Sequence, residues 1–187
     1  EAESYREYWN ASWDANNDGL PDPGSPSWLD RENPDWKGNY KVKYWDPDWQ
    51  RIIFGSPNSM IDKIMAQGFD GIYMDIIDAF EYYQEQGITG ADLRMVQFVQ
   101  NISQYVKTKQ PTLLVISQNG EVLAQFQEYL QAVDGIGRED VFFNGNRRQP
   151  LEATQIVLDH LNRFKSAGKF VLIIEYANIP KFQHEIK

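Results

Sequence analysis

The sequence predicts an α/β fold with a parallel sheet, and three observations support this prediction. Apolar, β-prone runs alternate with helix-periodic segments from residue 57 onward, and the links between them are short. The junctions AQGFDGIYMD and SAGKFVLIIEY repeat one order of helix, glycine, aromatic residue, strand and carboxylate. Short links imply parallel strands with right-handed crossovers, in either a doubly wound sheet or a (β/α)8 barrel. No glycine-rich nucleotide fingerprint follows any strand, which disfavours a nucleotide-binding sheet.

Each element is predicted from its local pattern. The four expected strands cover residues 69–75, 112–117, 133–137 and 169–176. The second strand, TLLVIS, lacks polar alternation, as expected when both of its faces are covered. Gly68 and Gly168 are expected to end the helices before them. Four helices are expected from apolar residues at helical spacing. The first contains Met60, Ile61, Ile64 and Met65, and the second, 89–108, contains Leu93, Val96, Val99, Ile102 and Val106. The third, 121–131, contains Val122, Leu123, Phe126 and Leu130, and the fourth begins at Pro150 and contains Val157, Leu158, Leu161 and Phe164.

Residues 1–50 differ in composition from the rest of the expected single domain, 1–187. The segment mixes aromatic residues with Pro, Gly, Asp and Asn, and is expected to form a long structured loop with helical character only at its start. Its aromatic rings either stack on sugar or fill the core beneath the loop, and both interpretations stay open. All six tryptophans lie here: Trp9, Trp13, Trp28, Trp36, Trp45 and Trp49.

The composition excludes several classes of function. The formal net charge is −9, which disfavours nucleic acid and anionic membranes as partners and also aids solubility. The chain has no cysteine, which excludes disulfides, thiolate nucleophiles and cysteine-ligated metals. No run of about 18 apolar residues occurs, so no membrane span is expected. The first residue is Glu1 rather than Met, and no signal-like segment follows, so we expect a trimmed or partial chain.

The stretch GFDGIYMDIIDAFEYY places three carboxylates at and after the end of a strand. With a period of two, Gly71, Tyr73 and Asp75 point to one side of this strand. In a barrel, that side is the interior, and Asp75 lies at the catalytic end. Asp78 is either a residue of the functional site or an N-terminal cap of the following helix. Glu81 is expected to be a cap or a solvated surface residue.

The other strands also end in polar residues. The sequence continues into Gln118 and Asn119 after the second strand, into Arg138, Glu139 and Asp140 after the third, and into Glu175 and Tyr176 after the fourth. Only two histidines occur, so a Ser-His-Asp triad or a histidine-rich zinc site is disfavoured. Paired carboxylates without His or Cys suit glycoside hydrolysis, in which one carboxyl group protonates the leaving oxygen and the other attacks carbon or activates water.

The run DANNDGLPD matches part of a calcium-binding loop. Its candidate ligands at positions 1, 3, 5 and 9 are Asp14, Asn16, Asp18 and Asp22, with Gly19 at position 6. The twelfth position, usually a bidentate Glu, is Ser25, which lowers the expected affinity. A turn held by its own Asp and Asn side chains is the alternative. No other cofactor is expected.

Four blocks together carry a family resemblance: EAESYREYW, NYKVKYWDPDWQ, GFDGIYMDIIDAFEYY and ISQNGE. They resemble the bacterial branch of glycoside hydrolase family 114, the endo-α-1,4-polygalactosaminidase-like proteins. The resemblance implies a (β/α)8 TIM barrel, with residues 1–3 at the exit of its third strand. The chain then supplies about strands four to seven, so the barrel is expected to be incomplete.

The resemblance also implies site residues and a substrate. Asp75 matches the aspartate proposed as nucleophile, and Glu139 matches the acid/base residue. The implied substrate is a cationic α-1,4-linked galactosamine polysaccharide, cleaved by a secreted or cell-surface monomer. A carboxyl separation of about 5–5.5 Å implies retention of configuration, and about 6.5–9.5 Å implies inversion. The implied substrate-binding residues are Glu1, Glu3, Tyr73, Asp78, Asn119 and Tyr176, with Trp45 as a stacking candidate.

Two other classes of function compete with hydrolysis. A non-catalytic carbohydrate-binding barrel would keep the aromatic surface without turnover. A calcium-stabilised structural or adhesion module would use the loop at residues 14–22. Release of reducing ends from galactosamine polymers distinguishes the first of these from an enzyme.

Overall fold

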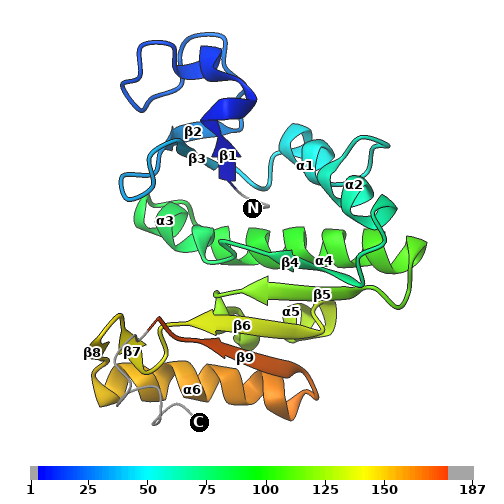
Figure 1. Ribbon diagram of the computed structural model, residues 1–187, viewed down its shortest axis with the longest axis vertical. Helices are drawn as coiled ribbons and strands as arrows, with labels where there is room; N and C mark the ends of the chain where they lie inside the picture. Colours follow the sequence, from blue (N-terminus) through cyan, green and yellow to red (C-terminus); the bar gives the residue numbers. More distant parts are fainter. Residues whose placement is uncertain (1–3, 177–187) are drawn as a thin grey trace.

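The computed structural model describes residues 4–176, which form a small antiparallel sheet above a larger parallel sheet (Figure 1). The larger sheet is parallel throughout and has the order β4-β5-β6-β9. This order follows the chain, as repeated right-handed strand–helix units require. The described strands do not close into a barrel, because β4 and β9 lie at the two ends of the order. The strands are β4 (Gly71–Met74), β5 (Leu114–Gln118), β6 (Gly135–Glu139) and β9 (Phe170–Ile174).

Helices follow each of the first three strands of this sheet. Two of them, α3 and α4, separate β4 from β5, and α6 separates β6 from β9. A two-stranded hairpin, β7 (Phe143–Asn144) and β8 (Arg147–Arg148), lies between β6 and α6. The helical elements are α3 (Ala79–Glu85), α4 (Ala91–Lys109), the short 3-10 helix η3 (Glu121–Gln125), α5 (Gln127–Ala132) and α6 (Leu151–Ser166).

The two faces of the parallel sheet differ sharply in burial. Ile72, Met74, Val115 and Ile136 are at most 5% exposed and belong to the main hydrophobic core. The register pairs Tyr73 with Ile116 on the opposite face. That face remains partly open along the sheet: Tyr73 47%, Leu114 39%, Phe170 38% and Leu172 49% exposed. The predicted alternation along β4 is therefore confirmed, with its apolar residues turned to the core.

The regular part of the chain matches the sequence prediction closely. All four strands occur within two residues of the expected starts, and Gly68 and Gly168 adopt the left-handed conformation after their helices. Two details were wrong. Leu93 is 55% exposed, because α4 buries Ala91 and Met95 instead. The expected helix 121–131 is interrupted at Phe126, whose extended backbone separates η3 from α5.

The first fifty residues, expected to form a long structured loop, include a small sheet that was not predicted. They contain a three-stranded antiparallel sheet of order β1-β3-β2 (Figure 1). Its strands are only three or four residues long, so period-two alternation is too short to read from the sequence. The remaining elements before β4 are short helices. The bounds are β1 (Ser4–Arg6), η1 (Glu7–Trp9), η2 (Ala11–Asp14), β2 (Leu29–Glu32), β3 (Asn39–Val42), α1 (Pro47–Ile53) and α2 (Met60–Ala66).

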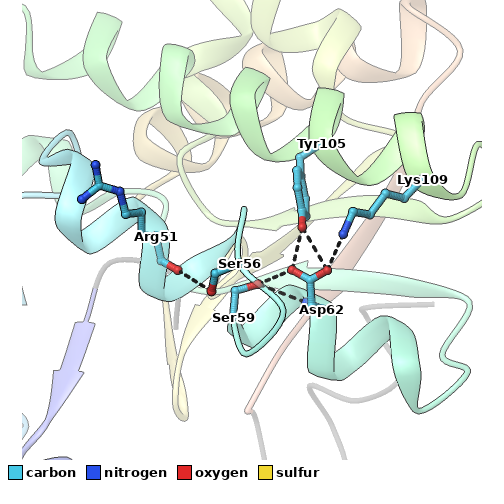
Figure 2. A network of polar contacts seen from close by, with 6 residues as sticks. All are labelled: Arg51, Ser56, Ser59, Asp62, Tyr105 and Lys109. Carbon is cyan, nitrogen blue, oxygen red and sulfur yellow. Dashed lines mark hydrogen bonds and ion pairs between the residues drawn. The ribbon is translucent and has the colours of Figure 1, made fainter.

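A polar network joins α2 to the carboxyl end of α4 (Figure 2). Asp62 accepts hydrogen bonds from Ser59 Oγ, from Tyr105 Oη at 2.7 and 2.9 Å, and from Lys109 Nζ at 2.6 Å. Ser59 in turn caps α2 by accepting from the main-chain N–H of Asp62 at 3.3 Å. Burial alone would raise the pKa of Asp62, but these hydrogen bonds outweigh it and lower the pKa below its usual value.

Replacing Asp62 with alanine should therefore lower the free energy of unfolding by about 2 kcal/mol at neutral pH. The folded-state pKa lies below the unfolded value, so this contribution is present above the unfolded pKa and is lost as the pH falls through the folded pKa. Urea unfolding at several pH values measures both effects. Asp48, which pairs with Arg51 on the exposed surface of α1, provides the control. Asp48→Ala should cost at most about 0.5 kcal/mol, and an equal loss in both variants would contradict the role given to Asp62.

Candidate active site

The carboxyl ends of the parallel strands β4, β5, β6 and β9 lie at one edge of the sheet (Figure 1). Asp75 directly follows β4, while Gln118 and Glu139 are the last residues of β5 and β6. Gln118 pairs with Gly137, and Glu139 pairs with Ile174. Because paired residues of parallel strands point to the same face, this register turns Asp75, Gln118 and Glu139 toward the open face of the sheet.

The side chain of Tyr73 extends from β4 across the open face of the sheet toward β5 and β6. Its hydroxyl donates a hydrogen bond to Oε1 of Gln118, whose side chain is buried. The ring passes over Gly137, where an added Cβ would overlap the Tyr73 hydroxyl. Burial raises the pKa of Tyr73, and the charges of Glu139 and Asp75 raise it further. By the strand register, Tyr73 lies on the same open face of the sheet as both candidate catalytic carboxylates.

Tyr176 makes a second link at this edge of the sheet. Its hydroxyl donates to Oε1 of Glu139. This hydrogen bond raises the pKa of Tyr176 to about 12, with further contributions from burial and from the charges of Glu139, Asp140 and Asp75. Tyr176 therefore remains a protonated donor at neutral pH and holds one oxygen of the Glu139 carboxylate.

Three non-glycine residues at these strand exits have left-handed backbone conformations. They are Ile76 after β4 (φ 61°), Asn119 after β5 (φ 59°) and Asp140 after β6 (φ 53°). Such a conformation is unusual for a β-branched side chain and costs about 1–3 kcal/mol. At Ile76 it brings the main-chain N–H to Oδ1 of Asp75 at 2.9 Å. The backbone after each of these strands therefore has a defined conformation, which fixes the direction of the side chain at the end of the strand.

Asp78 and Glu81 extend the acidic character of the site. Asp78 occupies the N-cap position of α3, but its side chain makes no capping hydrogen bond. Burial raises the pKa of Asp78; Arg138 opposes this shift, whereas Glu121 and Asp75 add to it. The pKa of Glu81 is raised by burial and by the charges of Asp78 and Glu121. The structure thus brings Asp78 into the electrostatic environment of Asp75 without giving it the capping bond that the alternative interpretation required.

Asn119 lies where the sequence predicted a site residue. Its Oδ1 accepts the main-chain N–H of Glu139 at 3.2 Å, and its own N–H donates to the carbonyl of Gly137 at 2.8 Å. Asn119 thereby contacts the main chain of β6 on both sides of residue 138. The predicted Glu1 and Glu3 lie outside the described residues.

Several residues with clear roles at this edge were not among the predicted site residues. Gln118 receives the Tyr73 hydroxyl, and Arg138 contacts both Asn119 and Glu121. Glu175 accepts the main-chain N–H groups of Phe142 and Phe143 at 2.8 and 3.1 Å, so its carboxylate holds the loop after β6. The polar ends of the strands were visible in the sequence, but the partner of each side chain depends on the strand register.

The tryptophans of the first fifty residues mostly pack inside the protein. Trp28 and Trp49 are at most 4% exposed and contact each other at a ring-centroid separation of 4.7 Å. Trp45 packs edge-on against Tyr83, and the Arg94 guanidinium lies 4.7 Å from its ring centroid. Trp36, by contrast, is 68% exposed. Core packing therefore accounts for most of these rings, and Trp36 presents the largest exposed surface of an indole in this segment.

The loop predicted to bind calcium is held by its own hydrogen bonds. Asp14 is buried and accepts from Tyr40 Oη and from the main-chain N–H groups of Asp18 and Gly19. Asp22 accepts from the N–H of Ala15 at 2.7 Å, and Asn16 donates to Asp18 at 3.0 Å. Within residues 4–176, no group of three or more acidic or histidine side chains is placed to hold a metal ion. The alternative turn interpretation accounts for the observed contacts.

The calcium proposal has a direct test. If the loop binds calcium, millimolar calcium should raise the Tm by about 2–4 °C, because a ligand that binds only the folded state stabilises it. The shift should disappear in Asp18→Ala, whose carboxylate would be one of the ligands. Differential scanning calorimetry with and without a chelator measures this shift. Identical melting curves would contradict the calcium proposal and leave the hydrogen-bonded turn.

Sequence comparison gives matches along almost the whole chain. The profile described as glycoside-hydrolase family GH114 matches residues 8–186. An uncharacterized protein of Methanocaldococcus jannaschii is 39% identical over 184 residues, which cover 95% of this chain and 50% of that protein. An uncharacterized protein of Thermotoga maritima is 38% identical over 185 residues, which cover 95% of this chain and 53% of that protein. The chain therefore spans about half the length of these curated relatives.

Structural comparison identifies the same type of fold. The glycoside hydrolase domain of PelA from Pseudomonas aeruginosa superposes with a TM-score of 0.66 at 15% identity, covering 98% of this chain and 68% of that domain. A variant of that domain with a glutamate replaced by alanine gives a TM-score of 0.65 at 14% identity, covering 99% and 68%. At this level of identity, the similarity establishes the fold. The open parallel sheet is therefore an incomplete part of a TIM-barrel-like architecture.

Proposed function

The chain belongs to glycoside-hydrolase family GH114, and from this premise we propose that it cleaves glycosidic bonds in a galactosamine-containing polysaccharide. Asp75 and Glu139 are the proposed catalytic carboxylates. The observation that carries the proposal is that Asp75 and Glu139 lie at the carboxyl ends of β4 and β6 and, by the strand register, on the same open face of the sheet. Glycoside hydrolysis uses two carboxyl groups that flank the scissile glycosidic bond.

The proposed roles follow from the contacts of each carboxylate. Glu139 donates a proton to the leaving glycosidic oxygen, while Tyr176 holds one of its carboxyl oxygens. Asp75 acts from the exit of β4, which β5 separates from β6, either as the nucleophile or as the base for a water molecule. Asp75 accepts the N–H of Ile76 at 2.9 Å, which fixes the orientation of its carboxylate. The separation of the two carboxyl groups in the complex with substrate decides between retention and inversion.

The charge of the site supports a cationic sugar as substrate. Asp75 and Asp78 follow β4 and Glu139 ends β6, at the same end of the sheet, and the whole chain carries a formal net charge of −9. An acidic site attracts ammonium groups and raises their local concentration. We therefore propose α-1,4-linked, partly deacetylated galactosamine as the substrate, cleaved by a monomer that is secreted or at the cell surface. In the described part of the chain, no helix is long and apolar enough to cross a membrane.

Reducing-end release from α-1,4-galactosamine polymers tests this proposal. The assay should use the chain with any flanking sequence that its gene encodes, because the matched relatives are about twice as long. We expect release from the partly deacetylated polymer and much less from a neutral α-1,4-glucan of equal length. Equal release from both polymers would refute the proposed substrate, and absence of release would refute hydrolysis.

Non-catalytic binding of carbohydrate is the second candidate. Trp36 and Tyr8 are 68% and 80% exposed in the segment before β4, and exposed aromatic rings are suited to stacking on sugar. Binding of the polymer without release, measured by calorimetry, would favour this function. Loss of that binding in Trp36→Ala would identify the surface involved.

A further inference from the structure

Arg138 occupies a central position between the exits of β5 and β6. It directly precedes Glu139, and its Nε lies 2.9 Å from Oε2 of Glu121 at the start of η3. The side chains of Arg138 and Glu121 are only 23% and 14% exposed. Two exposed charges would gain at most about 1 kcal/mol from such a pair. This pair is largely removed from water; Nε makes no hydrogen bond there, so its contact with Glu121 is a close ion pair.

The same guanidinium also contacts the groups that hold Glu139. Its Nη1 donates to Oδ1 of Asn119 at 3.2 Å and to the main-chain carbonyl of Glu139. Oδ1 of Asn119 also accepts the main-chain N–H of Glu139 at 3.2 Å. One amide oxygen thus receives donors from two consecutive residues of β6. This arrangement fixes the peptide groups on both sides of the Glu139 α-carbon.

The backbone next to this cluster is under strain. Asn119 and Asp140 have φ angles of 59° and 53°, so the loops after β5 and β6 both turn through left-handed conformations. Such conformations persist when surrounding contacts determine them. The planar guanidinium has several donors in a fixed geometry, which allows it to contact Glu121, Asn119 and the main chain together.

We propose that Arg138, held by Glu121, is the positioning residue for Glu139. By fixing the side chain of Asn119 and the carbonyl of Glu139, it sets the direction in which the Glu139 carboxylate leaves the sheet toward Tyr176. Its guanidinium is already engaged by three protein groups, so it acts through Glu139 and does not bind the sugar. This role rests on the proposed hydrolysis.

Replacement of Arg138 with glutamine tests the role kinetically. Misplacement of Glu139 should lower kcat roughly 10- to 100-fold while KM changes less than about 2-fold, because the lost interaction matters in the transition state. Arg138→Lys keeps the charge but not the planar set of donors, so its kcat should remain at least about 5-fold below the wild-type value. Glu121→Gln should lower kcat in the same direction. A wild-type kcat in Arg138→Gln would overturn the proposal.

A matched ion pair at the other end of the sheet provides the control. Lys107 pairs with Asp134 at 2.7 Å just before β6 begins, and the two side chains are 31% and 29% exposed. Lys107→Gln should reduce stability to a similar degree but leave kcat unchanged. If Arg138→Gln and Lys107→Gln lower kcat equally, Arg138 has only a structural effect and the proposal fails.

Amide hydrogen exchange tests the positioning role without substrate. The Glu139 N–H should exchange at least about 10-fold faster in Arg138→Gln than in the wild type, while core amides of α4 keep their protection. In Lys107→Gln the Glu139 N–H should remain protected. Unchanged exchange at Glu139 would overturn the role of Arg138 even if the enzyme is active. An inactive wild-type protein would instead refute hydrolysis, and the exchange result would still decide the positioning role.

Discussion

Substitution of Asp75 by asparagine or of Glu139 by glutamine is expected to lower polysaccharide hydrolysis by about 10²–10⁴-fold. Each substitution keeps the size of the side chain but removes the carboxylate that the reaction uses. Both residues are partly exposed at strand exits, so the folded state should be retained. Reducing-end assays on the galactosamine polymer, with Tm measured in parallel, separate loss of catalysis from loss of folding.

Two exposed carboxylates away from the strand exits provide controls for these substitutions. Asp70 lies at the opposite end of β4 from Asp75, and Glu128 lies exposed on α5. Asp70→Asn and Glu128→Gln should keep wild-type activity within about 2-fold, because they change the net charge equally without touching the site. If they lose activity as Asp75→Asn does, net charge explains the effect. If Asp75→Asn and Glu139→Gln remain fully active, the catalytic assignment is wrong.

Replacement of Gly137 with alanine is expected to displace the Tyr73 side chain from its position next to Gly137. The new Cβ would overlap the Tyr73 hydroxyl and approach Gln118 Oε1 to 3.0 Å. Because Gln118 is buried whereas the Tyr73 ring is 47% exposed and can move aside, we expect a loss of about 1 kcal/mol in unfolding free energy. Activity should fall at least about 10-fold, since the displaced ring would move into the space between the two carboxylates. Urea unfolding and the reducing-end assay measure these effects.

A double-mutant cycle identifies the cause of this effect. In Gly137→Ala combined with Tyr73→Ala, the overlapping hydroxyl and ring are absent, so the alanine at position 137 should cost little. We expect a coupling free energy of about 1 kcal/mol between the two positions. Strict additivity of the two single substitutions would show that Gly137 has another role.

The fold was predictable from the sequence where apolar strands alternate with helix-periodic segments. The strand GIYM and the helix with Val99, Ile102 and Val106 follow patterns that local periodicity reveals. The strand exits were predictable for the same reason, because parallel strands end at one edge. Asp75 and Glu139 were therefore accessible as candidates, with their individual roles supplied by the family resemblance.

The remaining features depend on contacts between distant segments. The bond from Tyr73 to Gln118 spans 45 residues and requires a glycine at position 137, which lies on a third strand. Glu175 looked like another site carboxylate, but it holds two main-chain N–H groups of the loop after β6. The small sheet before β4 escaped prediction because its short strands lie among irregular segments, without the regular strand–helix alternation that surrounds β4. In each case, strand register or tertiary packing decides the outcome.

A structure of the Asp75→Asn protein with a bound galactosamine oligosaccharide tests the central claim most directly. We expect the sugar to lie at the carboxyl ends of β4 and β6. One glycosidic oxygen should lie within hydrogen-bonding distance of Glu139, with residue 75 on the other side of that bond. An oligosaccharide bound elsewhere, for example on Trp36, with the strand exits empty, would contradict the account.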